Sequence, residues 1–206
     1  MDEFIHMKSP KDFIRLVAQD TNILMEGFCR YTTNISTRGM AVSMQTMQIM
    51  FRLCQHLGPS HILDAGSGFS SYGFRKYQQM FDPDVKVVTV DDNVVWLDRT
   101  RWFLDSERLS TEHLHSLQVF MERVPHEYYD IIFYDLGTGK VRRENLPLFM
   151  KYRHGAGYMI LDDMHQRENL ALAKKLAEEW GLDFVELKEE TMDEYGRWAG
   201  VLCRRK

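Results

Sequence analysis

The chain has 206 residues, of which 44% are apolar and 27% charged, and its formal net charge is −4. These values are ordinary for one globular domain of roughly 100–200 residues, and the small acidic excess argues against a dedicated nucleic-acid binder. No apolar run approaches the ~20 residues needed to span a bilayer, and the first residues lack the basic-then-apolar order of a secretory signal. We therefore expect a single cytoplasmic domain over residues 1–206 that acts on a small molecule, with no nucleic acid and no membrane as partner.

The first 57 residues are predicted to be helical. Ser9-Pro10 offers an N-cap followed by a proline in the first turn, and a second helix is expected to begin near Ser43 and to stop before Gly58-Pro59. The polar segment 31–40 between them is either a mobile lid or an ordinary helix-helix connection. Residues 1–57 would thus form a helical cover on a cofactor-binding α/β core of residues 58–206.

The segment 61–73 contains a short apolar run, an acidic residue and a Gly-x-Gly turn that leads into a helix. Ile62 and Leu63 predict a buried strand, and the two glycines remove Cβ atoms that would keep a ligand away from the backbone. A dinucleotide fingerprint places a third glycine where this chain has Ser71. Asp64, two residues before the first glycine, would repel a pyrophosphate and favour a ligand that presents a cation. The candidate cofactor contacts in this segment are Asp64, Gly66, Ser67, Gly68 and Ser70.

This arrangement resembles the first motif of the class I S-adenosylmethionine-dependent methyltransferases, in which an apolar strand leads to Asp or Glu and then to Gly-x-Gly. The resemblance implies S-adenosylmethionine as the cofactor, since its ammonium and sulfonium groups are the kind of cation that Asp64 would favour. A tight strand-to-helix turn without any ligand is the alternative interpretation of the same residues.

Downstream of this motif, apolar runs alternate with helical patterns, as in βαβ units that build a parallel sheet. A helix is expected over 166–180, with Trp180 on its inner face. The last two strands follow each other without a long helix, which predicts an antiparallel hairpin at the edge of the sheet. This ending resembles the methyltransferase fold and implies a doubly wound, Rossmann-like α/β sheet of seven strands, in the order 3-2-1-4-5-7-6 with strand 7 antiparallel. The strands expected after the first are 85–90, 117–120 (weak), 131–134, 158–161, 184–187 and 198–203.

Two adjacent acids follow the predicted second strand. A carboxylate at the tip of this strand can accept hydrogen bonds from the ribose hydroxyls of a nucleoside. The resemblance assigns ribose binding to the first acid, so we expect this role at Asp91, with Asp92 as the alternate. Trp96 would lie against the adenine ring or, equally well, in the core behind the following helix.

Acids also end the later strands, with Asp135 after the fourth and Asp162 and Asp163 after the fifth. Ligands bind at the carboxyl ends of strands in open α/β sheets, so these acids are expected to converge with Asp64 and Asp91 on one crevice. Oxygen ligands from the three later acids would suit Mg²⁺ or another divalent cation. They resemble the metal site of catechol and caffeoyl-type O-methyltransferases, but with Asp-Asp in place of Asp-Asn and no lysine at the third position after the first acid. The sequence leaves a metal requirement open.

Methyl transfer is an in-line displacement, so the protein mainly aligns the reactants and deprotonates the acceptor. His165 is the first candidate for the general base, because imidazole titrates near neutral pH. Lys140 and Arg142 are the next candidates, either as catalytic groups or as sites for an anionic substrate, and Asp135 is expected beside the methyl group.

The sequence thus predicts an S-adenosylmethionine-dependent methyltransferase that acts on a small molecule, with oxygen as the preferred acceptor atom. The rival hypotheses are an NAD-dependent oxidoreductase and a non-catalytic module that binds a nucleoside or a protein partner. A homodimer is one of the oligomeric states that the sequence leaves open.

Overall fold

The computed structural model describes residues 21–124 and 127–205, so the helix expected from Ser9 to residue 20 lies outside the described residues. The helices are α2 (Thr21–Asn34), α3 (Met44–Leu57), α4 (Phe69–Met80), α5 (Val94–Ser106), α6 (Leu117–Arg123), α7 (Gly139–Phe149), the 3₁₀ turn η3 (Met150–Tyr152), α8 (Arg167–Glu179) and α9 (Lys188–Thr191). The strands are β1 (His61–Ala65), β2 (Lys86–Asp91), β3 (Leu114–Ser116), β4 (Tyr129–Tyr134), β5 (Arg153–Leu161), β6 (Leu182–Glu186) and β7 (Gly200–Arg204).

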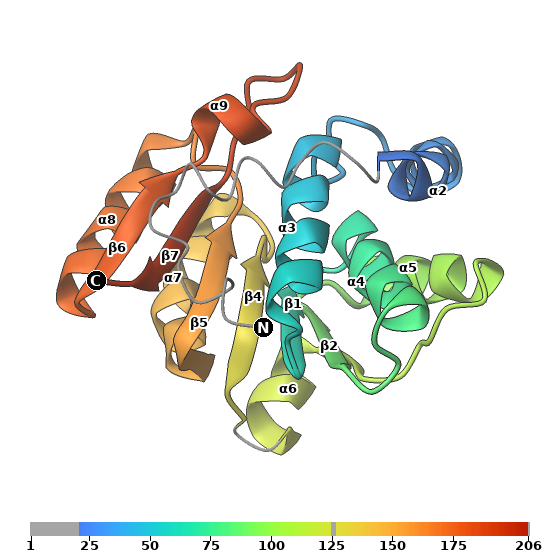
Figure 1. The fold of residues 1–206 in the computed structure, drawn as a ribbon, viewed down its shortest axis with the longest axis horizontal. Helices are drawn as coiled ribbons and strands as arrows, with labels where there is room; N and C mark the ends of the chain where they lie inside the picture. Colours follow the sequence, from blue (N-terminus) through green and yellow to red (C-terminus); the bar gives the residue numbers. More distant parts are fainter. Residues whose placement is uncertain (1–20, 125–126, 206) are drawn as a thin grey trace.

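The strands form one seven-stranded sheet in the order β3-β2-β1-β4-β5-β7-β6 (Figure 1). β1 to β5 are parallel to their neighbours, whereas β7 runs antiparallel between β5 and β6. A dinucleotide-binding Rossmann sheet has the order 3-2-1-4-5-6, without such an inserted strand. The predicted sheet order and the antiparallel strand 7 are therefore confirmed.

Helices cover both faces of the sheet, and the strand sequences show why. Successive residues of a strand point to opposite faces. Ile62 and Ile131 accordingly join the apolar cluster under α2 to α5, while their neighbours Leu63 and Ile132 join the cluster under α6 to α8. Parallel strands buried on both sides need this continuous apolar run. The layering brings the carboxyl ends of β1, β2, β4 and β5 to one edge.

Helix α3 begins and ends where the sequence predicts. The Ser43 side chain accepts a hydrogen bond from the Thr46 amide at 3.0 Å, which caps the helix start. Gly58 ends the helix in the left-handed region with φ of 55°, a conformation that costs glycine little. Among the described residues, no helix combines the length and the apolar character that a membrane crossing requires.

Three expectations differ from the structure. Residues 117–120 lie in α6 and not in a strand, because the Ser116 hydroxyl caps a helix by accepting from the Val119 amide; the third strand lies just before it. Trp180 follows the last residue of α8 and is 44% exposed, so it does not face inward. The predicted terminal hairpin is present, with the short helix α9 between its strands.

The segment 31–40 is an anchored connection, not a freely moving lid. It begins inside α2, where Tyr31 is buried with 1% of its surface exposed. Further along, the Arg197 guanidinium donates to the carbonyl groups of Arg38 at 3.1 Å, Gly39 at 2.8 Å and Ala41 at 3.0 Å. These bonds fasten the connection between α2 and α3 to the segment that precedes β7.

Candidate cofactor and active site

The turn after β1 lies close to the end of β4. Gly66 has a φ of 111°, and a Cβ atom there would lie 2.5 Å from the carbonyl oxygen of Asp135. Both the backbone conformation and the lack of space therefore require glycine. Within the turn, the Ser70 hydroxyl donates to the Gly66 carbonyl at 3.3 Å, and the Gly68 amide donates to the Ser71 hydroxyl at 3.1 Å. The sequence thus builds a rigid turn at the sheet edge where ligands bind in this architecture.

Asp91 joins the end of β2 to this turn. Its Oδ2 atom accepts hydrogen bonds from the Ser67 amide at 2.7 Å and the Ser67 hydroxyl at 2.6 Å, and its Oδ1 atom accepts from the Asn93 amide at 2.8 Å. A carboxylate offers about four acceptor positions, so roughly one remains. Asp91 is 4% exposed. Burial raises its pKa, whereas these hydrogen bonds lower it. A pair of ribose hydroxyls could both bind only if the Ser67 hydroxyl released its bond.

Asp92, the alternate ribose ligand, is exposed and lies beside the β4–α7 connection. A Cβ atom on Gly137 would approach its Oδ1 atom to 2.7 Å. The structure therefore places the two neighbouring acids differently: Asp91 is bonded into the turn, whereas Asp92 faces the loop that follows β4.

Asp64 is fully buried beneath the turn. Its Oδ2 atom accepts from the Ser71 hydroxyl at 2.5 Å and from the Thr89 hydroxyl at 3.0 Å, and Arg75 in turn donates to the Thr89 hydroxyl at 2.9 Å. The Oδ1 atom is buried without a hydrogen-bond partner in the part of the chain that the structure describes. Burial raises the pKa of Asp64 to about 6, while the Ser71 hydrogen bond and nearby Arg75 oppose that rise. Asp64 lies near Asp91 and Asp135, since all three raise the pKa of Tyr31, but its side chain is buried beneath the turn; its contact with a cofactor stays a prediction.

Tyr31 and Trp96 lie over the turn. A Cβ atom on Gly68 would be 3.0 Å from the Tyr31 hydroxyl and 3.8 Å from the Trp96 indole nitrogen, which itself donates to the Ser67 carbonyl at 2.8 Å. Burial raises the pKa of Tyr31, and the charges of Asp64, Asp91 and Asp135 raise it further. The phenol is therefore protonated at neutral pH and lies within the field of three carboxyl groups.

The acids after β4 and β5 surround an arginine. Arg142 of α7 forms salt bridges with Asp135 and, at 2.6 Å, with Asp163. Desolvation raises the pKa of Asp135, and the charge of Arg142 opposes this rise. Desolvation and the charge of Asp163 raise the pKa of Asp162 to about 6. The Asp162 Oδ1 atom accepts from the Asp163 amide at 2.8 Å. The convergence predicted for these three acids is present, but they surround a protein cation.

This arrangement does not fit the predicted divalent-metal site. Mg²⁺ prefers six oxygen ligands at about 2.0–2.1 Å in near-octahedral geometry. Two of the three expected ligands, Asp135 and Asp163, instead hold the guanidinium of Arg142. In residues 21–124 and 127–205, no group of three or more His, Cys, Asp or Glu side chains is arranged to hold a metal ion.

The other two catalytic candidates lie at the surface of this region. His165 has a side chain that is 34% exposed, and its Nδ1 atom is 3.6 Å from Asp163. Lys140 has a side chain that is 80% exposed and lies 3.8 Å from Glu144 of the same helix. Histidine is therefore the candidate base that the structure holds beside the acidic cluster.

A hollow of about 260 Å³ opens between α2, the start of α3 and the segment before β7. Its lining includes the apolar side chains of Met25, Phe28 and Met44 and the guanidinium of Arg197. Burial raises the pKa of both Asp135 and Asp162, and the charge of Arg197, which lines the hollow, weakly opposes that rise.

Sequence reasoning missed two side chains that the structure places at the centre of the site. Tyr31 was assigned to the start of a polar connection, and Arg142 was considered only as a next candidate to His165. Tyr31 reaches the turn from a helix far away in the sequence. Arg142 pairs with Asp135 seven residues earlier and with Asp163 21 residues later, and neither side chain belongs to a motif of fixed spacing. The spacing of Arg142 was a signal for its role. An arginine seven residues after Asp135, on the helix that follows the strand, can reach back to the strand end.

No protein-family model matches the chain, and no curated protein matches it. Solved structures do. An O-methyltransferase from Bacillus cereus in complex with SAH (S-adenosylhomocysteine) superimposes with a TM-score of 0.66 at 16% identity, covering 94% of this chain and 96% of that one. The O-methyltransferase TomG from Streptomyces achromogenes, involved in tomaymycin synthesis and solved with SAM (S-adenosylmethionine), gives 0.64 at 14% identity and 95% of each chain. The SAH-bound methyltransferase PaMTH1 from Podospora anserina superimposes with a TM-score of 0.62 at 14% identity, covering 89% of this chain and 88% of that one.

The chain has the class I methyltransferase fold. The similarity spans nearly the whole length of both chains in each comparison, including the strand order that distinguishes this fold from a dinucleotide-binding Rossmann sheet. The acids described above gather at one edge of this sheet. The turn after β1 and the ends of β2, β4 and β5 form that edge.

Proposed function

We propose that this protein transfers a methyl group from S-adenosylmethionine to an oxygen atom of a small molecule. The observation that carries the proposal is the Gly66-Ser67-Gly68 turn bonded to the Asp91 carboxylate, on a sheet of the methyltransferase order. Two structural neighbours that bind SAM or SAH are O-methyltransferases, which supports oxygen as the acceptor atom.

The residues proposed to hold the cofactor are those around the turn. The remaining acceptor position of Asp91 suits a ribose hydroxyl, and the unpartnered Oδ1 atom of Asp64 lowers the cost of placing a cationic group nearby. Tyr31 and Trp96 would adjust to admit the nucleoside. Bound S-adenosylmethionine would supply an electrophilic methyl group, and the surrounding residues would exclude water and fix its direction.

We propose His165 as the base that removes the acceptor proton. Its Nδ1 atom lies 3.6 Å from Asp163, so the ring is positioned beside the acidic cluster, and histidine is the side chain that most often acts as a general base. Lys140 and Asp135 stay weaker proposals, because the first is held toward solvent by Glu144 and the second is paired with Arg142. The 260 Å³ hollow is the proposed acceptor site, which co-crystallisation with an acceptor would test.

The decisive experiment is isothermal titration calorimetry with S-adenosylhomocysteine and, separately, NAD. We expect S-adenosylhomocysteine to bind and NAD not to bind. Asp91→Ala should weaken S-adenosylhomocysteine binding at least about tenfold, or about 1.4 kcal/mol, because a buried ribose acceptor is lost.

Asp92→Ala is the matched control, since this neighbouring acid is exposed, and its affinity should stay within about threefold of wild type. Equal affinities of wild type and Asp91→Ala would show that the ribose site is elsewhere. Binding without methyl transfer to any of a panel of phenolic acceptors would favour the non-catalytic module, and NAD binding alone would favour an oxidoreductase. The cytoplasmic location and the oligomeric state stay predictions.

A further inference from the structure

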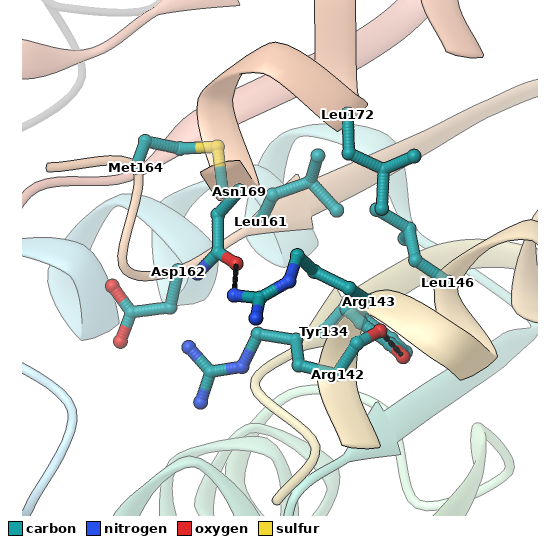
Figure 2. A pocket seen from close by; sticks show the side chains of 9 residues that line it. All are labelled: Tyr134, Arg142, Arg143, Leu146, Leu161, Asp162, Met164, Asn169 and Leu172. Carbon is teal, nitrogen blue, oxygen red and sulfur yellow. Dashed lines mark hydrogen bonds between the residues drawn. The ribbon is translucent and has the colours of Figure 1, made fainter. Parts of the chain in front are cut away.

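The position expected for a divalent cation holds a guanidinium that is built into the fold. Arg142 lies near the start of α7, and its side chain extends back to the ends of β4 and β5. Only 8% of this side chain is exposed. Figure 2 shows its side chain beside that of Arg143, whose guanidinium turns instead toward Asn169. The two adjacent arginines thus have different environments.

Every nitrogen of the Arg142 guanidinium has an oxygen acceptor. The Nη1 atom donates to Asp163 at 2.6 Å, and the Nη2 atom donates to the Asp135 carboxylate and to the carbonyl groups of Asp135 at 3.2 Å and Gly137 at 3.1 Å. The Nε atom donates to the Leu136 carbonyl at 3.4 Å. Carboxylates and carbonyl groups converging on one point are the donor set that a hard cation would use, and here they converge on a side chain.

The electrostatics point the same way. Three carboxyl groups gathered at one strand edge would repel each other unless a cation compensates them. Arginine stays protonated throughout the physiological pH range, and the pKa of Arg142 is raised further by Asp135 and Asp163. A divalent ion placed between these acids would meet a fixed positive charge and would find two of its ligands already engaged.

We propose that Arg142 is the permanent cation of this site and takes the place of a divalent metal ion. It neutralises Asp135 and Asp163, holds the loops after β4 and β5 together, and keeps the site closed to Mg²⁺. This inference concerns the site at which methyl transfer is proposed, but its test uses metal binding and folding and does not depend on turnover.

The test is a Mn²⁺ titration of the chelator-treated full chain, followed by the electron paramagnetic resonance signal of free Mn²⁺. Wild type should show no stoichiometric site. Arg142→Ala should gain one, with at least about tenfold higher Mn²⁺ affinity than wild type. The same variant should be less stable than wild type without metal and should regain thermal stability when Mn²⁺ is added.

Arg143→Ala is the matched control, because it removes the adjacent arginine of the same helix, which bonds Asn169 and does not form the salt bridges with Asp135 and Asp163 that Arg142 forms. It should not gain a Mn²⁺ site. Adding Asp163→Asn to Arg142→Ala should abolish the gained site, which would locate it at the strand ends.

Two results would overturn the proposal: stoichiometric Mn²⁺ binding to wild type that Asp163→Asn abolishes, or a folded Arg142→Ala that gains no Mn²⁺ affinity. Should Arg142→Ala fail to fold, Arg142→Lys keeps the charge but cannot form the bridging fork. Arg142→Lys should fold and should not bind Mn²⁺ stoichiometrically. An Arg142→Lys protein that is as stable as wild type and yet binds Mn²⁺ would contradict the inference.

Discussion

Asp64 has one carboxylate oxygen bonded to Ser71 and Thr89 and the other buried without a partner among the described residues. Burial raises its pKa to about 6, so the folded protein holds this proton more tightly than the unfolded chain, where an aspartate titrates near 4. Between about pH 4 and pH 6 the folded state therefore binds more protons, and stability falls as the pH rises through this window. The loss is complete above the folded pKa.

Asp64→Asn removes this titration while keeping an oxygen acceptor for both hydroxyl groups. The free energy of unfolding of wild type should fall from about pH 4 to pH 7, relative to Asp64→Asn, by about 3 kcal/mol at most. Urea unfolding at a series of pH values measures the difference. The raised pKa of Asp162 is present in both proteins and cancels. Parallel pH profiles for the two would mean that Asp64 is not perturbed.

At the same scale, the sequence predicted residues whose roles follow from local geometry. Gly66 and Asp91 stand at fixed offsets from strands that their own sequences define, so the turn and its acid could be located. Tyr31 and Arg142 could not, because their partners lie on elements whose packing the local sequence does not specify. The burial of Asp64 follows from its place within β1, where each side chain faces one of the two buried layers, and the motif alone did not indicate it.

Among the elements, the connection between α2 and α3 depends on a distant side chain. Arg197 bonds three carbonyl groups of this connection and forms a salt bridge with Asp193 at 2.6 Å, with only 16% of its side chain exposed. Its removal would leave the Asp193 Oδ2 atom and these carbonyl groups without the guanidinium donor, while Asp193 Oδ1 keeps the amides of Tyr195 and residue 197.

Arg197→Ala should therefore lower the free energy of unfolding by about 2–3 kcal/mol and speed hydrogen exchange in residues 37–43. Arg205→Ala provides the comparison, because its salt bridge with Asp183 is more than half exposed, and it should cost less than about 1 kcal/mol. Chemical denaturation and exchange mass spectrometry measure both variants. Equal small effects would show that Arg197 does not anchor the connection.

Element prediction succeeded where a pattern was long or capped. α3 and α8 have several turns of helical periodicity and identifiable ends, and β2 and β4 are mainly apolar and buried. It failed at 117–120, because four residues cannot distinguish a period of 3.6 from a period of 2. Ser116, directly before the predicted strand, is the N-cap that decides for a helix.

On the scale of the whole molecule, the proposed cofactor site joins the two halves of the sheet. The turn after β1 contacts β2 through Asp91 and the end of β4 through the close approach of Gly66 to Asp135. A ligand bound there contacts only the folded arrangement, so it stabilises the protein by mass action.

S-adenosylhomocysteine at about 100 times its dissociation constant should add about 2.7 kcal/mol of stability, which corresponds to roughly 5–10 °C in the thermal midpoint for a chain of this size. NAD at the same concentration should leave the midpoint unchanged, and Asp91→Ala, whose affinity is at least about tenfold lower, should gain about 1.4 kcal/mol or less from the same S-adenosylhomocysteine concentration. Differential scanning calorimetry measures all three. An identical shift with NAD would contradict the cofactor assignment.

Tyr31 gives the site a kinetic property as well as a shape. Its hydroxyl lies where a Cβ of Gly68 would be 3.0 Å away, and its ring packs between Phe69 and Phe103, with centroids at 5.8 and 5.1 Å. We therefore expect a molecule that binds at the turn to displace this ring, and with it part of α2, when it enters or leaves. The residence time of such a molecule would then depend on how often α2 moves away from the turn. A side chain that looks like part of the core would thus set the dissociation rate.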